Sequence, residues 1–161
     1  MRAGPEVIVR RAGPDDREGL QPLAKALATS FEPSPTTFAP RFSRLISEPN
    51  ALVLVAGDER SGHLIGYLLG FRHETFFADG LVGWVEEIYT SADWRRKGVA
   101  AALMEAFETW AWESGARLVA LATRRAHAFY EAIGYEESGA YFRKVASEWR
   151  RTDPGGRAMP R

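Results

Sequence analysis

One stretch decides the fold of this chain: VEEIYTSADWRRKGVA, residues 85–100. Its first part belongs to a β-branched and aromatic run that predicts a strand over residues 82–90. Small residues at Gly98 and Ala100 then open an amphipathic helix, which we expect over residues 98–114. The first N–H groups of a helix are unpaired and its dipole favours anions, so a helix start that follows three cations suits a phosphate group. The stretch therefore predicts a strand, an anion-binding turn and a helix.

The turn between this strand and this helix also has a simpler interpretation. Arg95, Arg96 and Lys97 can form a solvated basic turn in which Gly98 only permits the bend. The turn carries neither the Gly-x-Gly-x-x-Gly dinucleotide fingerprint nor the Gly-Lys-Ser/Thr ending of a nucleotide P-loop. The choice between the two interpretations therefore depends on the rest of the chain.

The elements on either side of the stretch predict an α/β fold with a mixed, mostly antiparallel sheet flanked by helices on both faces. The expected order is β-α-α-β-β-β-α-β-α-β-β. A Pro-rich loop over residues 33–40 and a hairpin connection over residues 57–62 separate some of these elements. Hydrophobic periodicity places the other strands and helices at 7–11, 16–31, 41–48, 51–56, 63–77, 117–122, 124–133 and, as returning β structure, 135–145.

The composition fits one domain without a bulk charge or a disulfide framework. Among 161 residues, 21 are Lys or Arg and 21 are Asp or Glu, so no net field attracts nucleic acid or an acidic membrane. The chain has no cysteine, which excludes disulfides, thiolate nucleophiles and Cys-based zinc sites. We expect a single domain over residues 1–146 and a flexible C-terminal tail over residues 147–161.

The sequence predicts neither a membrane segment nor a metal site. No run approaches the roughly 18 apolar residues that a membrane span needs, and residues 7–9 are too short for a signal peptide. We therefore expect a soluble, cytoplasmic protein. His63, His73 and His127 are scattered along the chain without the spacing of metal ligands.

A second motif, AHAFYEAIGY at residues 126–135, follows the helix and a further strand. It is similar to Ala-x-x-Phe-Tyr-x-x-x-Gly-Phe, a signature of the GNAT superfamily of N-acyltransferases. Arg95, Gly98 and Ala100 match the coenzyme-binding pattern of the same family, Gln/Arg-x-x-Gly-x-Gly/Ala. The resemblance covers roughly residues 7–145. It implies the GNAT fold, acetyl-CoA as the coenzyme and an amine as the acetyl acceptor.

The resemblance also implies roles for single residues. The backbone of Ile88 and Thr90 would pair with the pantetheine arm, and the amides of residues 96–100 would hold the pyrophosphate. Tyr130 would lie close to the thioester sulfur. The full set of residues that we expect to bind acetyl-CoA is Ile88, Tyr89, Thr90, Arg95, Arg96, Lys97, Gly98, Val99, Ala100, Ala101, Thr123, Phe129 and Tyr130.

Acetylation of an amine needs a base and an acid. An alkylammonium has a pKa of about 10 and must lose a proton before it attacks a carbonyl. Glu86 and Glu87 are the candidate bases, and the resemblance favours Glu86, because several family members carry an acidic residue at the corresponding position. Because adjacent strand residues point to opposite faces, we expect only one of them to face the acceptor; both can equally be solvated or ion-paired. Tyr130 can protonate the leaving thiolate, or it can be a core aromatic residue.

Two departures from the family pattern leave alternatives open. Thr123 stands where the family often has Asn, and Thr90 where Val is more usual. A GNAT fold that binds acyl-CoA without catalysis is therefore a second hypothesis, and a nucleic-acid binder that uses the basic turn is a third. A small-molecule amine is favoured over a protein as acceptor, and Glu32 and Glu74 are further acids that could pair with it. A homodimer, common in this family, stays open.

Overall fold

A computed structural model describes residues 7–29, 31 and 33–149 of the chain. Its five-stranded sheet has the order β1-β2-β3-β4-β5; β4 and β5 are parallel and the other neighbours are antiparallel. The strands are β1 (Val7–Arg11), β2 (Ala51–Asp58), β3 (Leu64–Thr75), β4 (Gly80–Thr90) and β5 (Leu118–Leu121). The helices are α1 (Arg17–Leu27), α2 (Pro35–Ser47), α3 (Val99–Glu113) and α4 (His127–Ala132), with short 3-10 turns at Pro14–Asp16, Ala92–Trp94 and Ser147–Trp149.

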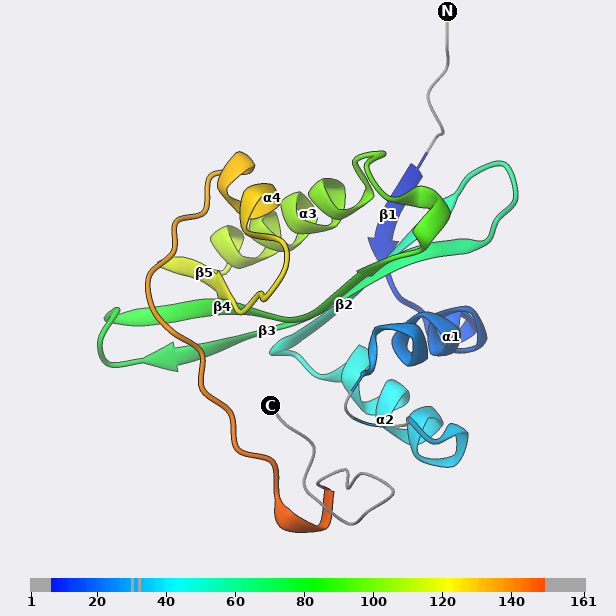
Figure 1. Ribbon diagram of the computed structural model, residues 1–161, viewed down its shortest axis with the longest axis horizontal. Helices are drawn as coiled ribbons and strands as arrows, with labels where there is room; N and C mark the ends of the chain where they lie inside the picture. Colours follow the sequence, from blue (N-terminus) through cyan, green and yellow to red (C-terminus); the bar gives the residue numbers. More distant parts are fainter. Residues whose placement is uncertain (1–6, 30, 32, 150–161) are drawn as a thin grey trace, which may run out of the picture.

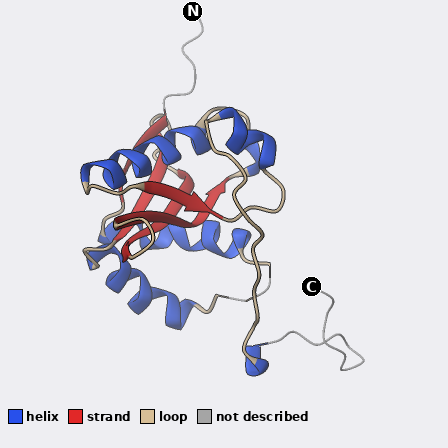
Figure 2. Cartoon of the chain, turned by 90° about the vertical axis from the view of Figure 1, so that its left-hand side faces the viewer, coloured by secondary structure: helices blue, strands red, loops and turns tan. Residues whose placement is uncertain are grey.

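The sheet lies between two layers of helices. The helices α1 and α2 cover one face, and α3 and α4 cover the other (Figure 1, Figure 2). Successive side chains of β3 point to opposite faces of the sheet, so the strand contributes to both cores. Leu68 packs in the core on the α3 side, whereas Tyr67 and Leu69 pack in the core beneath α1 and α2. The predicted mixed α/β architecture is therefore confirmed.

Close packing fixes α3 on the sheet. Phe107 is fully buried and lies over Gly70 of β3 and Gly83 of β4, neither of which has a Cβ to keep it away. Arg72 of β3 also holds this helix. Its guanidinium lies 4.8 Å from the centre of the Trp110 ring and donates a hydrogen bond to Ser114 Oγ. The helix that follows the basic turn is thus attached to β3 and to β4, the strand that carries both candidate bases.

The second helix begins earlier than the sequence predicts. Residues 33–40 were expected to form a Pro-rich loop, but α2 already begins at Pro35. Proline at the first helical position has its φ preset for a helix and loses no hydrogen bond there, so Pro35 starts the helix rather than breaking it. The first helix is shorter than predicted, since α1 ends at Leu27 and not at residue 31.

The predicted β structure over residues 135–145 is wrong. Residues 135–146 are in neither a helix nor a strand, and most of them are exposed. A strand needs a neighbouring backbone, and in the described part of the chain none lies alongside these residues. Of the predicted tail, Ser147–Trp149 forms a 3-10 turn, and residues 150–161 lie outside the described residues.

In the part of the chain that the structure describes, no helix combines the length and the apolar character that crossing a membrane would require.

The packing of α3 generates a prediction. A Cβ added by Gly70→Ala would lie 2.8 Å from Phe107 Cζ, closer than such contacts occur, and Phe107 is fully buried. We expect this variant to lose about 1 to 3 kcal/mol of unfolding free energy, measured by urea denaturation. Gly57→Ala is the matched control, because its Cβ would meet only His63 O at 3.8 Å. Equal stability of the two variants would contradict this account of the α3 contact.

Candidate functional site

The centre of the site is the point where β4 and β5 part. The two strands pair only from Val82–Leu118 to Val85–Leu121, after which β5 ends and β4 continues to Thr90. On its other side β4 stays paired with β3 as far as Thr90. The β5 side of residues 86–90 is therefore not covered by a neighbouring strand, and an extended ligand can pair there as a strand would.

A β-bulge lies directly beyond the last β4–β5 pair. Opposite β3, Leu69 pairs with Glu87 and Gly70 with Val85, so Glu86 is an extra residue without a partner of its own. A bulge of this kind disrupts the ladder locally and increases the twist of the strand. It accounts for the place at which β4 turns away from β5.

The bulge also changes where the two glutamates point. Glu87 pairs with Leu69, whose side chain packs in the core beneath α1 and α2, so Glu87 points to that face. Trp84 pairs with Phe71 of the same core, and its Nε1 donates to Glu86 Oε2 at 2.9 Å. Both carboxylates therefore point to the α1/α2 face. The assumption that these adjacent residues point to opposite faces, on which we based the prediction that only one of them faces the acceptor, does not hold at the bulge.

The environments of the two carboxylates differ. Glu86 is exposed, whereas Glu87 is partly buried. Burial raises the pKa of Glu87, and the nearby charge of Glu86 raises it further. Glu87 is thus a stronger base than an ordinary carboxylate, and water solvates it less well than it solvates the exposed Glu86.

A buried hydroxyl lies close to Glu87. Burial, and then the charge of Glu87, raise the pKa of Tyr67, whose ring is buried and whose hydroxyl has no hydrogen-bond partner among the described residues. An unpaired buried hydroxyl costs about 1 to 3 kcal/mol. A water or a ligand beside Glu87 that forms a hydrogen bond with the Tyr67 hydroxyl would remove this cost. Tyr67 and Glu87 therefore indicate a place where a polar molecule can bind.

The turn before α3 leaves backbone donors free. The first helical hydrogen bond runs from Ala102 N to Gly98 O at 3.0 Å, so the helix does not use the N–H groups of residues 99–101. Gly98 has φ 83° and Arg96 has φ 61°, both in the left-handed region. This conformation turns the backbone tightly in front of the helix, and the residues around it are exposed.

The cations of this turn lie near the end of β4. The Nε of Arg95 donates to Thr90 O at 3.4 Å, and its guanidinium lies 5.9 Å from the centre of the Tyr89 ring. Lys97 lies 5.1 Å from the centre of the Trp94 ring. An anion bound at the start of α3 would therefore be close to two positive charges.

Tyr130 approaches the parting strands from α4. It is 8% exposed and packs in the same core cluster as Val85, with Ile88 against it. The Tyr130 ring packs edge-on against the Tyr135 ring, with 5.8 Å between the ring centres. The Tyr135 hydroxyl donates a hydrogen bond to Glu108 Oε1 of α3 at 2.7 Å. Burial raises the pKa of Tyr130, so its hydroxyl stays protonated at neutral pH.

Thr123 starts the turn into α4. Its Oγ1 accepts a hydrogen bond from Ala126 N at 3.2 Å. Through this bond, the residue that replaces the family's Asn holds the helix on which Tyr130 is placed.

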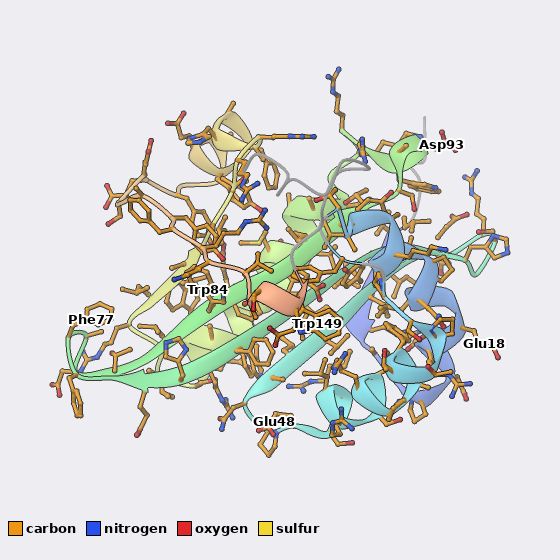
Figure 3. The ribbon with its side chains drawn as sticks, turned by 60° about the horizontal axis from the view of Figure 1, so that its bottom comes forward. Glu18, Glu48, Phe77, Trp84, Asp93 and Trp149 are labelled. Carbon is orange, nitrogen blue, oxygen red and sulfur yellow. The ribbon has the colours of Figure 1, made fainter. Side chains whose placement is uncertain are left out.

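The fold brings most of the predicted site residues together but separates one acceptor candidate. Both glutamates and Tyr130 lie near the point where β4 leaves β5, and the basic turn lies at the end of the same strand. Glu74 pairs with Leu81 near the tip of the β3–β4 hairpin, six residues along β4 from Glu87, or roughly 20 Å at strand spacing. Phe77 marks this tip in Figure 3, well away from Trp84. Glu32 lies outside the described residues.

Two residues of the site escaped the sequence prediction, Tyr67 and Trp84. The pattern of β3 and β4 identifies them only as strand aromatics, and their place beside Glu87 and Glu86 depends on the register. The described residues contain no group of three or more His, Cys, Asp and Glu side chains that could hold a metal ion.

Comparison with known proteins identifies the family. Residues 20–135 match the model of the acetyltransferase (GNAT) family. An aminoglycoside N(6')-acetyltransferase type 1 from Acinetobacter genomosp. 13 is 31% identical over 111 residues, which cover 63% of this chain and 75% of the relative. A second relative of the same description, from Stenotrophomonas maltophilia, is 37% identical over 68 residues, 38% of this chain and 44% of the relative.

Solved structures share the fold. Glucosamine-6-phosphate N-acetyltransferase from Arabidopsis thaliana superposes with a TM-score of 0.78 at 19% identity, over 87% of this chain and 98% of its own. AAC(6')-Iy, solved with the bisubstrate analog CoA-S-monomethyl-acetylneamine, has a TM-score of 0.72 at 21% identity, over 88% and 99% of the two chains. Together with the family match, these findings show that the chain belongs to the GNAT acetyltransferase family, whose members transfer an acetyl group from acetyl-CoA to an amine.

Proposed function

We propose that this enzyme acetylates a primary amine of a small cationic molecule, by direct attack of the amine on acetyl-CoA in a ternary complex. The observation that carries the proposal is the parting of β4 and β5 beside two carboxylates that point to one face. Two acids on this face favour an acceptor with more than one amino group. The relatives named as aminoglycoside acetyltransferases support an aminoglycoside-like polyamine as the first class to test.

The coenzyme half of the proposed site is made mainly from backbone. The unpaired β5 side of residues 88–90 suits the amides of the pantetheine arm, and the free N–H groups of residues 99–101 suit its pyrophosphate. We assign Arg95 and Lys97 to the phosphate charge. Tyr89, Arg96, Gly98, Thr123 and Phe129 complete the coenzyme site that we propose.

For the base we propose Glu87 rather than Glu86. A base works best when its pKa approaches the working pH, and burial and the neighbouring carboxylate raise the pKa of Glu87. The Glu87 carboxylate accepts a proton from the ammonium, directly or through a water beside Tyr67. The neutral amine then attacks the thioester carbonyl, and a backbone N–H near Ile88 stabilises the negative charge that develops on its oxygen. Glu86, which accepts a hydrogen bond from Trp84, attracts the cationic acceptor.

For the acid we propose Tyr130. When the tetrahedral intermediate collapses, the bond between carbon and sulfur breaks and the thiolate takes the electron pair. The Tyr130 hydroxyl gives its proton to this thiolate. The nitrogen that attacked loses its extra proton, which water carries back to Tyr130, so that both the amide and the tyrosine end neutral. The buried ring and its contact with Tyr135 hold the hydroxyl in one place between turnovers.

We also propose a cytoplasmic location, a homodimer and a single catalytic domain that ends near residue 146. The lack of cysteine supports a reducing compartment. The proposal includes neither nucleic acid nor a membrane as a partner, because positive and negative charges balance over the chain.

The coenzyme assignment predicts a loss of affinity when a negative charge enters the turn. Ala100→Asp places a carboxylate beside the proposed pyrophosphate site, so we expect a rise in the acetyl-CoA Kd of more than about tenfold. Isothermal titration measures this, and an amine panel measures turnover. Thr109→Asp, an exposed position on the same helix, is the control and should keep the wild-type Kd. Equal affinity in the two variants would exclude the start of α3 as the phosphate site.

The choice of base predicts a pH dependence. As pH falls through the raised pKa of Glu87, the base form is lost, so kcat/KM should decline at a pH above the ordinary carboxyl range of about 4. Glu87→Gln should lower kcat/KM by about 10²- to 10⁴-fold and remove this acidic limb. It should not lower the melting temperature at pH 7, because it replaces a partly buried charge. Glu86→Gln is the control: it should raise KM and keep the limb, moved to lower pH because the charge of Glu86 no longer raises the pKa of Glu87. The reverse pattern would make Glu86 the base.

The assignment of Tyr130 as the acid predicts that its hydroxyl affects kcat and does not affect the binding of acetyl-CoA. Tyr130→Phe should lower kcat by about 10²-fold or more and leave the acetyl-CoA Kd unchanged, because only the donated proton is lost. Tyr135→Phe removes the same atom five residues further on, together with its bond to Glu108. This control should lose about 1 kcal/mol of stability but keep most of kcat. Unchanged turnover in Tyr130→Phe would leave Tyr130 as a core residue.

A further inference from the structure

Trp84 is a large aromatic side chain of β4 that the proposed mechanism uses only as a hydrogen-bond donor. It lies along the strand between the hairpin tip at Phe77 and the turn at Asp93 (Figure 3). The ring is half-buried and packs in neither core cluster of the described residues, although Phe71 opposite it packs beneath α1 and α2. On its other side Trp84 pairs with Ala120 of β5, whose methyl group is too small to cover an indole. The ring therefore lies at the surface of the face to which both carboxylates point.

The hydrogen bond from Trp84 Nε1 to Glu86 Oε2, at 2.9 Å, determines which part of the ring a ligand can use. The bond occupies the polar atom of the indole, so the ring still offers its π faces. Among aromatic side chains, tryptophan attracts a cation to its face most strongly, and a hydrogen bond from its N–H to a carboxylate polarises the ring in the favourable sense. The carboxylate also brings a negative charge to the edge of the ring. Trp84 and Glu86 together thus suit an ammonium group.

Two other tryptophans of the chain show the same kind of contact. The guanidinium of Arg72 lies 4.8 Å from the centre of the Trp110 ring, and the ammonium of Lys97 lies 5.1 Å from the centre of the Trp94 ring. Among the described residues, no lysine or arginine lies over Trp84 in this way. A cationic ligand can therefore take this position without displacing a side chain.

The reacting amino group has a place of its own at Glu87. The Tyr67 hydroxyl close to Glu87 is buried and has no hydrogen-bond partner among the described residues. An ammonium group can donate one hydrogen bond to the carboxylate and another to the hydroxyl oxygen. Glu87 lies three residues beyond Trp84 on β4, and the bulge between them shortens the strand, so the two side chains start roughly 7 to 10 Å apart.

We propose that Trp84, together with Glu86, binds a second ammonium group of the acceptor while Glu87 takes the reacting one, so that Trp84 selects acceptors with two amino groups at this separation. The inference rests on the proposed function, because it extends the site in which the first amino group is acetylated. Linear diamines such as hexamethylenediamine and amino sugars such as neamine share this chemistry. A monoamine of the same length, hexylamine, fills the same space but brings no second charge to Trp84.

Isothermal titration of these amines into the full chain saturated with coenzyme A tests the proposal without requiring turnover. The wild type should bind hexamethylenediamine about three- to thirtyfold more tightly than hexylamine, the range expected for a cation over tryptophan. Trp84→Leu should weaken the binding of the diamine by about threefold or more and leave that of hexylamine unchanged, because leucine still contacts an alkyl chain. Trp84→Phe keeps an aromatic face and should retain part of the preference.

The matched control is Trp112→Leu, which removes a tryptophan that is 49% exposed on α3 and should keep the wild-type preference. Equal affinity of the wild type for the two alkyl amines would overturn the inference, and so would the absence of binding by either. A preference that is unchanged in Trp84→Leu would overturn it as well.

Release of coenzyme A from acetyl-CoA, measured with the same amines, separates this inference from the proposed function. A diamine that binds with the expected preference but is not acetylated would support the ammonium site and count against acetyl transfer to such acceptors. Acetylation of both alkyl amines with equal KM would support acetyl transfer and overturn the ammonium site. If Trp84→Leu raises KM more for neamine than for hexamethylenediamine, the site serves amino sugars; the reverse order assigns it to linear diamines.

Discussion

The position of one extra residue in β4 governs the arrangement of the whole site. Glu86 has no partner on β3, and the last pair between β4 and β5 lies directly before it. The local twist at this bulge takes β4 away from β5, which leaves backbone for a ligand. The same residue reverses the alternation of side chains, so that Glu87 joins Glu86 on one face. The opening that we propose for the thioester and the carboxylates that we propose for the amine thus have a single physical cause.

Close packing keeps the elements around the bulge in fixed positions relative to one another. The α3 helix is held on β3 and β4 by the contact of Phe107 with Gly70, and its N-terminus faces the end of β4. The short α4 helix depends on α3 in turn, through the bond from Tyr135 to Glu108. Tyr130 is therefore placed by two elements whose positions the sheet already determines. A site built on such supports changes little when a ligand enters.

Local pattern predicted the elements whose character is local. The strand over residues 82–90 and the helix over residues 98–114 were predicted closely, because β-branched runs and helical periodicity are written in consecutive residues. The bulge at Glu86 could not be predicted, since register belongs to a pair of strands and not to one. For the same reason residues 135–145 looked like strands: their composition favours extended backbone, but they do not join the sheet that the described residues form. The start of α2 at Pro35 was missed because proline is favoured at the first position of a helix but disfavoured in its interior.

The free N–H groups before Ala102 also bear on how such a site evolves. Every amino acid except proline carries this donor, so a phosphate site made of amides survives most replacements of the side chains around it. The acceptor face depends instead on individual side chains such as Glu87 and Trp84, where one replacement alters charge or shape. If the proposed assignment holds, a change of acceptor needs only replacements of side chains on that face, and the amides that bind the coenzyme stay as they are.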